Sequence, residues 1–96
     1  MAEVYLVGHI SVKEADKWQT YRSQVPATLA PWQAELLFRG EKMAMLAGEH
    51  AYDDIVAIRF PTDAALQGWH ASPAYQALIP LRKEAAEVVL IAYRSV

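Results

Sequence analysis

Two residues of this 96-residue chain are candidates for catalysis, His9 and Arg82. His9 lies within an apolar stretch, where an imidazole could act as a general base or a hydrogen-bond donor inside a cleft. The alternative is a histidine whose hydrogen bonds are satisfied in the core or at its rim. Arg82 lies near the apolar face of a predicted helix, where its guanidinium could bind a ligand carboxylate. A structural ion pair, for example with Glu35, would account for it equally.

A wider set of aromatic and basic residues could line a small-molecule pocket. Aromatic residues at helical spacing are typical of a hydrophobic core, and they are also compatible with a pocket wall. Trp69 shares an apolar stripe with Ala65 and is expected in the core, whereas His70 lies one step off that stripe. Arg39, like Arg82, must find an ion-pair partner or bind a ligand. The pocket candidates are Tyr5, His9, Trp18, Arg39, Trp69, His70, Tyr75 and Arg82.

The sequence contains no motif for a metal, a nucleotide or a nucleophilic serine. The three histidines, His9, His50 and His70, lack the spacing of metal ligands, and the chain has no cysteine. No glycine-rich phosphate loop is present. Ser72 precedes Pro73, a pattern that predicts a helix N-cap in place of a nucleophile. We therefore expect neither a metal nor a cofactor.

The composition and charge of the chain disfavour two classes of binding partner, nucleic acids and membranes. Hydrophobic residues make up 54% of the chain, charged residues 21%, and the formal net charge is −2. The basic residues are scattered, which disfavours nucleic-acid binding. The apolar runs are too short to span a membrane, and an acidic Glu3 stands where a signal peptide would be basic. These features predict a cytoplasmic protein with no nucleic-acid or membrane partner.

The elements that must position these residues alternate between strands and helices. Residues 4–12 are apolar on both parities, with Tyr5, Val7 and His9 on one face and Leu6 and Ile10 on the other. A strand that is apolar on both faces is expected to be covered by other parts of the protein on both faces. Apolar and β-branched runs predict strands at 4–12, 54–60 and 87–94, and two strand pieces, 35–39 and 43–47, on either side of Gly40.

Two helical regions separate the strands. Apolar spacing predicts a helix over 14–30, with a kink or a restart near Ser23 that places Pro26 in the first turn of a second short segment. A second helix is predicted over 63–71, capped by Thr62. Ser72 and Pro73 should restart it, and Pro80 should interrupt it again.

The resulting order, βαββαβ, predicts one fold for the single domain of residues 1–96. It is an α+β, ferredoxin-like split βαβ fold, with a four-stranded antiparallel sheet and two helices on one face. The strands at 54–60 and 87–94 remain apolar on the face that no helix would cover. A second copy of the chain would bury that face, so we expect a homodimer. The alternative is a monomer whose apolar sheet face binds a ligand.

Several short motifs resemble the DUF1330 family. They are Arg39-Gly40, Tyr21-Arg22, Arg59-Phe60-Pro61, Gly68-Trp69-His70, Ser72-Pro73-Ala74-Tyr75-Gln76 and Leu81-Arg82. The resemblance covers nearly the whole chain and implies a dimeric α+β barrel. It implies little chemistry, because the family is defined by unknown function.

Three functions remain open from the sequence. The first is a homodimer that binds a small molecule between sheet and helices, which requires His9 and at least one arginine to project into a pocket. The second is a structural or interaction homodimer without a ligand. The third is a cofactor-independent, monooxygenase-like enzyme, by analogy of fold.

Overall fold

The structure, a computed structural model, describes residues 3–96. Four strands form the sheet, with bounds that largely match those predicted: β1 (Val4–Val12), β2 (Glu35–Glu41), β3 (Asp54–Phe60) and β4 (Ala86–Arg94). The helices are α1 (Ala15–Leu29), α2 (Asp63–Ala71), α3 (Pro73–Gln76) and α4 (Ile79–Ala85), with a 3-10 turn at Ala30–Trp32. The strand order is β2-β3-β1-β4, and every neighbouring pair is antiparallel.

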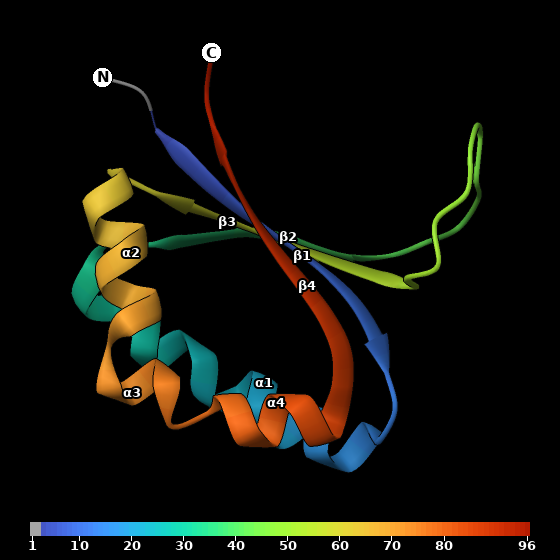
Figure 1. Ribbon diagram of the computed structural model, residues 1–96, viewed down its shortest axis with the longest axis horizontal. Helices are drawn as coiled ribbons and strands as arrows, with labels where there is room; N and C mark the ends of the chain where they lie inside the picture. The colour runs from blue at the N-terminus through green and yellow to red at the C-terminus, as the bar shows by residue number, and fades with distance from the viewer. Residues whose placement is uncertain (1–2) are drawn as a thin grey trace.

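The molecule has two layers. Among residues 3–96 all helices cover the same face of the curved sheet, as Figure 1 shows. This is the predicted ferredoxin-like βαββαβ arrangement. The second crossover is divided into α2, α3 and α4, as Ser72-Pro73 and Pro80 predict: Thr62 Oγ1 caps α2 and Ser72 Oγ caps α3. Each side chain thereby accepts a hydrogen bond from an otherwise unpaired amide.

Burial alternates along β1 and separates the two sheet faces. Val4, Leu6 and Ile10 are buried beneath the helices, whereas Tyr5 and His9 are only half-buried on the outer face. The core continues through α1 and β3, and its largest fully buried side chains are Trp69, Tyr75 and Phe60.

A β-bulge interrupts the pairing of β2 with β3. Leu36 pairs with Ile58 and Phe38 with Ala57, so Leu37 has no partner in the ladder. A bulge residue shifts the alternation of side chains by one position. As a result Leu36 and Arg39 lie on the inner face together, although three positions separate them, and Phe38 lies on the outer face.

The predicted break in the first helix is wrong. Helix α1 runs without interruption from Ala15 to Leu29, with Pro26 inside it. Proline removes one backbone hydrogen bond, but the buried residues Tyr21, Val25 and Leu29 on either side of it hold one continuous stripe against the sheet. The exposed Pro26 is therefore tolerated.

The predicted strand at 43–47 is also wrong. Residues 42–53 form an irregular arm that projects beyond the sheet, at the right of Figure 1. Met43 and Leu46 on this arm are 97% and 96% exposed. The apolar pattern that predicts a strand is present, but no strand of the same subunit lies beside it. The arm is closed at its base by a hydrogen bond from the Lys42 amide to the Asp53 carbonyl.

Candidate functional site

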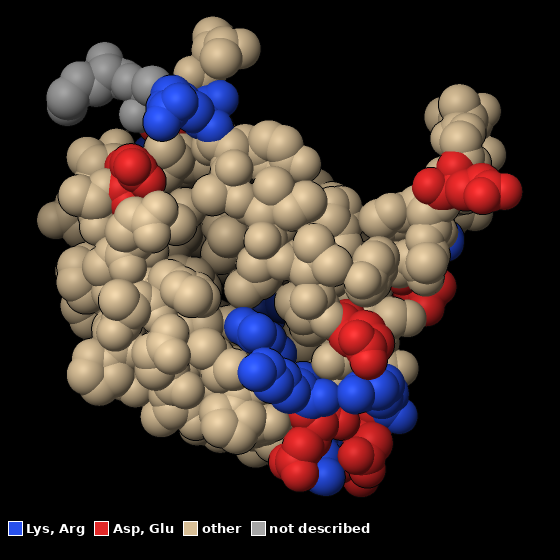
Figure 2. All heavy atoms as spheres, in the orientation of Figure 1, with Lys and Arg blue, Asp and Glu red and all other residues tan. Residues whose placement is uncertain are grey.

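A groove of about 490 Å³ opens between helix α1 and the inner face of the sheet. Its apolar wall contains Ile10 and Val12 of β1 and Trp18 of α1. Its polar wall contains the two arginines Arg22 and Arg39. Figure 2, seen with β4 and α4 in front, shows basic side chains gathered between the sheet and the helices. The volume lies within the range typical of small-molecule pockets, roughly 300–1,000 Å³.

The groove borders a smaller and more enclosed apolar cavity of about 30 Å³. Ile10, Trp18, Arg22 and Arg39 line both spaces and therefore form the boundary between them. Behind them the cavity wall is almost entirely apolar and aromatic. It consists of Leu6, Tyr21, Val25, Val56, Ile58, Trp69, Tyr75, Val88 and Leu90.

Two tyrosine hydroxyls meet at the wall of this cavity. The hydroxyl oxygens of Tyr21 and Tyr75 are 2.9 Å apart, and Arg82 Nη1 donates to the Tyr75 hydroxyl at 2.7 Å. Burial raises the pKa of Tyr21 well above its usual value, and the neighbouring Tyr75 adds to the effect. Tyr21 therefore provides a neutral hydroxyl at the cavity wall at ordinary pH.

Arg39 enters the cleft because of the bulge in β2. Its cross-strand partner Val56 is buried on the inner face, and the arginine side chain follows the same direction. Burial of the guanidinium lowers the pKa of Arg39, and the positive charge of the nearby Arg22 lowers it further. Within residues 3–96 no carboxylate lies within 4.0 Å of a nitrogen of Arg22 or Arg39.

The structure brings four of the eight pocket candidates to this cleft. Trp18 and Arg39 line both spaces, and Trp69 and Tyr75 line the smaller cavity. Arg82 contacts the cavity indirectly, through its hydrogen bond to Tyr75. His70 is exposed on α2 and packs its ring against Trp69 and Tyr75, with a centroid distance of 5.8 Å to Tyr75.

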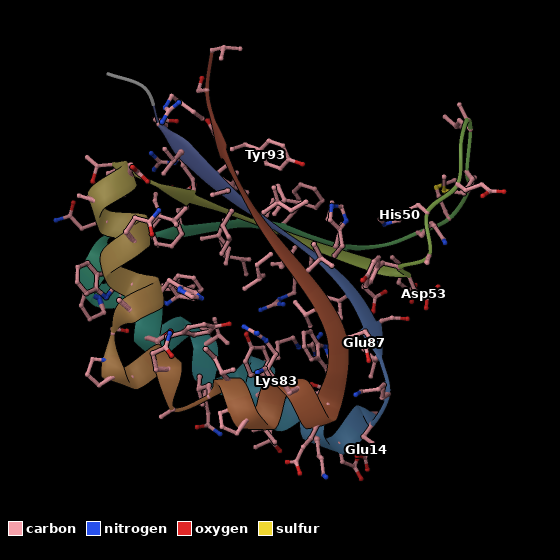
Figure 3. All side chains as sticks on the ribbon, in the orientation of Figure 1. Glu14, His50, Asp53, Lys83, Glu87 and Tyr93 are labelled. Atoms are coloured by element: carbon pink, nitrogen blue, oxygen red, sulfur yellow. The ribbon has the colours of Figure 1, made fainter. Side chains whose placement is uncertain are left out.

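Tyr5 and His9 do not reach the cleft, which corrects their placement in a pocket with the arginines. Both point to the outer face, because odd-numbered residues of β1 alternate away from the helices. The His9 ring packs edge-on against His50 of the arm, with centroids 4.8 Å apart, and lies 6.4 Å from Tyr52. Figure 3 shows His50 beside the outer side of the sheet. None of the described residues that line the cleft is a histidine, so none of them provides an imidazole as a general base.

The expected ion pair of Arg82 with Glu35 is not formed. Glu35 Oε2 instead accepts a hydrogen bond from Arg59 Nη2 at 2.9 Å, and Arg59 Nη1 contacts Glu3 Oε1 at 3.1 Å. Arg59 and Glu35 are cross-strand partners on the outer face, whereas Arg82 lies beneath the inner face on α4.

Arg22 lines the cleft but was not among the residues predicted to do so. The signal for Arg22 was its position four residues after Trp18, which places both on one side of α1. Tyr21 belongs to the apolar stripe of the same helix, and only the fold shows that this part of the stripe borders a cavity.

Metal ligation finds no support in the described part of the chain. Residues 3–96 contain no group of three or more histidine, cysteine, aspartate or glutamate side chains arranged to hold an ion. The same residues include no helix that is both long and apolar enough to cross a membrane.

The fold and the cleft together define a ferredoxin-like α+β protein with an apolar pocket between sheet and helices. The family model described as "Domain of unknown function (DUF1330)" matches residues 3–96, and the chain belongs to this family. No curated protein of known function matches its sequence.

Solved structures share the fold at low sequence identity. A protein of unknown function, RPA0582 from Rhodopseudomonas palustris, is similar with a TM-score of 0.84 and 15% identity, over 99% of this chain and 83% of that one. A dimeric ferredoxin-like protein of unknown function from Jannaschia sp. CCS1 has a TM-score of 0.75 and 12% identity, over 98% and 99%. SnoaB, a cofactor-independent oxygenase from Streptomyces nogalater, has a TM-score of 0.70 and 12% identity, over 100% and 95%.

Proposed function

We propose that the protein binds a small molecule in the cleft between helix α1 and the inner face of the sheet. The observation that carries the proposal is the continuity of two spaces. An open groove of about 490 Å³ meets an apolar cavity at a boundary that contains two arginines without carboxylate partners. Binding sites commonly combine an apolar wall with a few polar groups that orient the ligand.

The lining favours binding over acid–base chemistry. The titratable groups at the groove and cavity are the arginines, the two tyrosines, Glu41 and Asp54. The two carboxylates lie at the outer end of the groove, away from the apolar cavity. An oxygenase-like activity therefore rests on analogy of fold, and a ligand-binding role rests on the cleft itself.

The same proposal includes a homodimer formed through the outer sheet face. Phe38 is 53% exposed there, Tyr93 50% and Val89 37%, and they form an apolar surface with the half-buried Val7 and Ile91. Figure 3 shows Tyr93 projecting from β4 on the side away from the helices. A similar structure is described as a dimeric ferredoxin-like protein. A second copy of the sheet is the occupant that this surface fits, because association would bury apolar side chains on both sides.

The groove can be blocked without touching the core. Ala15, the first residue of α1, is exposed and lines the groove, whereas Ala27 is exposed on the same helix and lines none of the spaces around it. Isothermal titration calorimetry with two aromatic probes, 1-naphthoate and the neutral 1-naphthalenemethanol, tests occupancy. We expect Ala15→Trp to weaken every probe that binds by about tenfold or more, and Ala27→Trp to leave binding within about twofold.

Two results would contradict a ligand site in this cleft. One is that neither probe binds the wild-type protein at millimolar concentration. The other is that Ala15→Trp and Ala27→Trp have equal effects on binding. Thermal unfolding of both variants serves as the control, since either substitution is at an exposed position.

A further inference from the structure

Two positive charges converge on the inner end of the groove, and no carboxylate of the described residues forms an ion pair with either of them. Arg22 is half-buried on α1, and its Nη2 donates to Gln19 Oε1 at 2.7 Å. Arg39 reaches the same boundary from β2 and forms no side-chain hydrogen bond or ion pair within the described residues. Most donors of both guanidinium groups are therefore free to bind a ligand.

Two arginines on neighbouring elements, by contrast, bind partners within the protein. Arg59 lies between Glu3 and Glu35 on the outer face, and Arg82 donates to Tyr75. The contrast shows that carboxylate partners are supplied elsewhere in this small chain. Their absence at Arg22 and Arg39 leaves the repulsion between two like charges uncompensated, and an incoming anion would relieve it.

The remaining charges of the groove limit the charge of that anion. Glu41 and Asp54 form a cross-strand pair at the end of β2 and β3 and line the outer part of the groove. With Arg22 and Arg39 they bring the formal charge of the whole groove to zero: two positive and two negative charges. A singly charged head group can bind the arginines at the inner end, whereas a dianion would also be repelled by the two carboxylates.

The apolar wall of the groove indicates what the uncharged part of the ligand should be. Ile10, Val12 and Trp18 provide an apolar surface beside the arginines, and the smaller cavity continues it. An aromatic or aliphatic group packed against Trp18 would bury apolar surface on both partners. The planar fork of an arginine matches the two oxygens of a carboxylate.

We propose that the ligand of this cleft is an amphipathic monocarboxylate, whose carboxylate binds Arg22 and Arg39 and whose apolar part lies against Ile10, Val12 and Trp18. The proposal rests on the cleft being a ligand site and adds the chemical class of the ligand. Arg39 is the specificity-determining residue, because the bulge at Leu37 directs it inward and no protein group holds its guanidinium.

The test compares paired probes on matched arginine variants. Calorimetric titrations at pH 7 use 1-naphthoate, the neutral 1-naphthalenemethanol and 1-naphthyl phosphate. We expect the wild-type protein to bind 1-naphthoate about tenfold more tightly than either other probe. Arg39→Met should remove this preference by weakening 1-naphthoate alone, and Arg39→Lys, which keeps the charge and loses the fork, should fall between. Arg94→Met, at an exposed position at the end of β4, makes the same change in net charge and should leave all three affinities within about twofold.

Three results would overturn the proposed ligand class while leaving the cleft as a binding site. The first is equal binding of the carboxylate and the neutral alcohol. The second is tighter binding of the phosphate. The third is an equal loss of 1-naphthoate affinity in Arg39→Met and Arg94→Met. Failure of all probes to bind would instead contradict the proposed function itself, so the two failures are distinguishable.

Discussion

Thr28 is the one buried polar residue of the described core, and it connects α1 to Trp69. The indole Nε1 of Trp69 donates to Thr28 Oγ1 at 3.0 Å, and Thr28 Oγ1 in turn donates to the Val25 carbonyl at 2.7 Å. An indole N–H buried without an acceptor costs the free energy of its lost solvation. The threonine hydroxyl therefore allows a large aromatic side chain to be buried.

Replacing Thr28 by valine should lower the free energy of unfolding by about 1–3 kcal/mol, because the Trp69 N–H would lose its acceptor at constant side-chain shape. Urea unfolding followed by circular dichroism measures the change. Thr28→Ser keeps the hydroxyl and should recover most of the loss. A valine variant as stable as the wild type would show that the hydrogen bond contributes nothing.

The raised pKa of Tyr21 predicts how the free energy of unfolding depends on pH in the alkaline range. Burial raises its pKa in the folded protein above the ordinary value of 10.0, so the folded state holds the proton more tightly than the unfolded chain does. The stability from this group is complete below about pH 10 and declines as the pH rises further. We expect Tyr21→Phe to make the decline above pH 10 shallower, by at most ~1.4 kcal/mol per pH unit for one proton.

Urea unfolding of Tyr21→Phe and of the wild-type protein at several pH values between about 9 and 11 measures the slope of the unfolding free energy against pH. Identical slopes in Tyr21→Phe and the wild-type protein would contradict the assignment of a protonated, buried tyrosine.

Side-chain direction could be predicted for some of the cleft residues and not for others. Simple alternation along β1 places His9 and Ile10 on opposite faces, as the structure has them. The same rule fails for Arg39, because the bulge at Leu37 reverses the parity halfway along β2 and no residue type marks its position. The burial of Arg22 beside Arg39 depends on both the bulge and the packing of α1, so a single sequence could not predict it.

At the scale of elements, Gly8 of β1 leaves little space for a side chain between the neighbouring strands β3 and β4. Gly8 pairs with Val56 on one side and Leu90 on the other. A Cβ at this position would lie 2.8 Å from Val56 Cγ1 and 3.2 Å from Leu90 Cδ2. Both neighbours also line the smaller cavity, so glycine at this position lets them pack across the strand.

Gly8→Ala should therefore destabilise the protein by about 1–3 kcal/mol, as overpacking of a core does. Gly40→Ala, on β2 of the same sheet, is the matched control, because its Cβ would approach Ile55 Cγ2 only to 3.3 Å. Thermal unfolding of the two variants should rank Gly8→Ala clearly below Gly40→Ala. The reverse ranking would mean that Val56 and Leu90 move aside freely.

The bounds of some helices and strands depend on local sequence signals, and those of others depend on tertiary contacts. Caps at Thr62 and Ser72 and the uninterrupted apolar run of β3 are local, and their bounds could be predicted closely. The continuity of α1 through Pro26 depends on buried residues on both sides of it. Residues 43–47 have the composition of a strand but no strand beside them within the subunit, so composition alone predicts the wrong structure there.

At the scale of the whole molecule, the apolar surplus of the sequence lies on one surface. Helices cover the inner face of the sheet (Figure 1), and the outer face exposes Phe38, Val89 and Tyr93. The ion pair Lys13–Glu87 lies at one end of the molecule, near the labelled Glu14 and Glu87 in Figure 3, whereas Arg59 pairs with Glu3 and Glu35 on the outer face itself. The exposed Met43 and Leu46 extend the apolar surface along the arm.

The predicted homodimer should have twice the mass of the 10.7 kDa chain, about 21 kDa, in gel filtration with light scattering at low micromolar concentration. Val89→Glu places a charge at the centre of the outer face and should shift the mass toward the monomer, since burying an unpaired carboxylate is unfavourable. Gln24→Glu, at an exposed position on α1, adds the same charge and should leave the dimer intact. A wild-type mass near 11 kDa would contradict the dimer.

The central claim is that the ligand lies in the cleft on the inner face, and methyl NMR during a titration with 1-naphthoate tests it most directly. The expected result is a saturable shift of the methyl signals of Ile10, Val12 and Val25, which line the groove or the cavity behind it. Val7, Val89 and Ile91 on the outer face should stay unchanged. Shifts confined to these outer-face methyls, or no saturable shift at all, would contradict the claim.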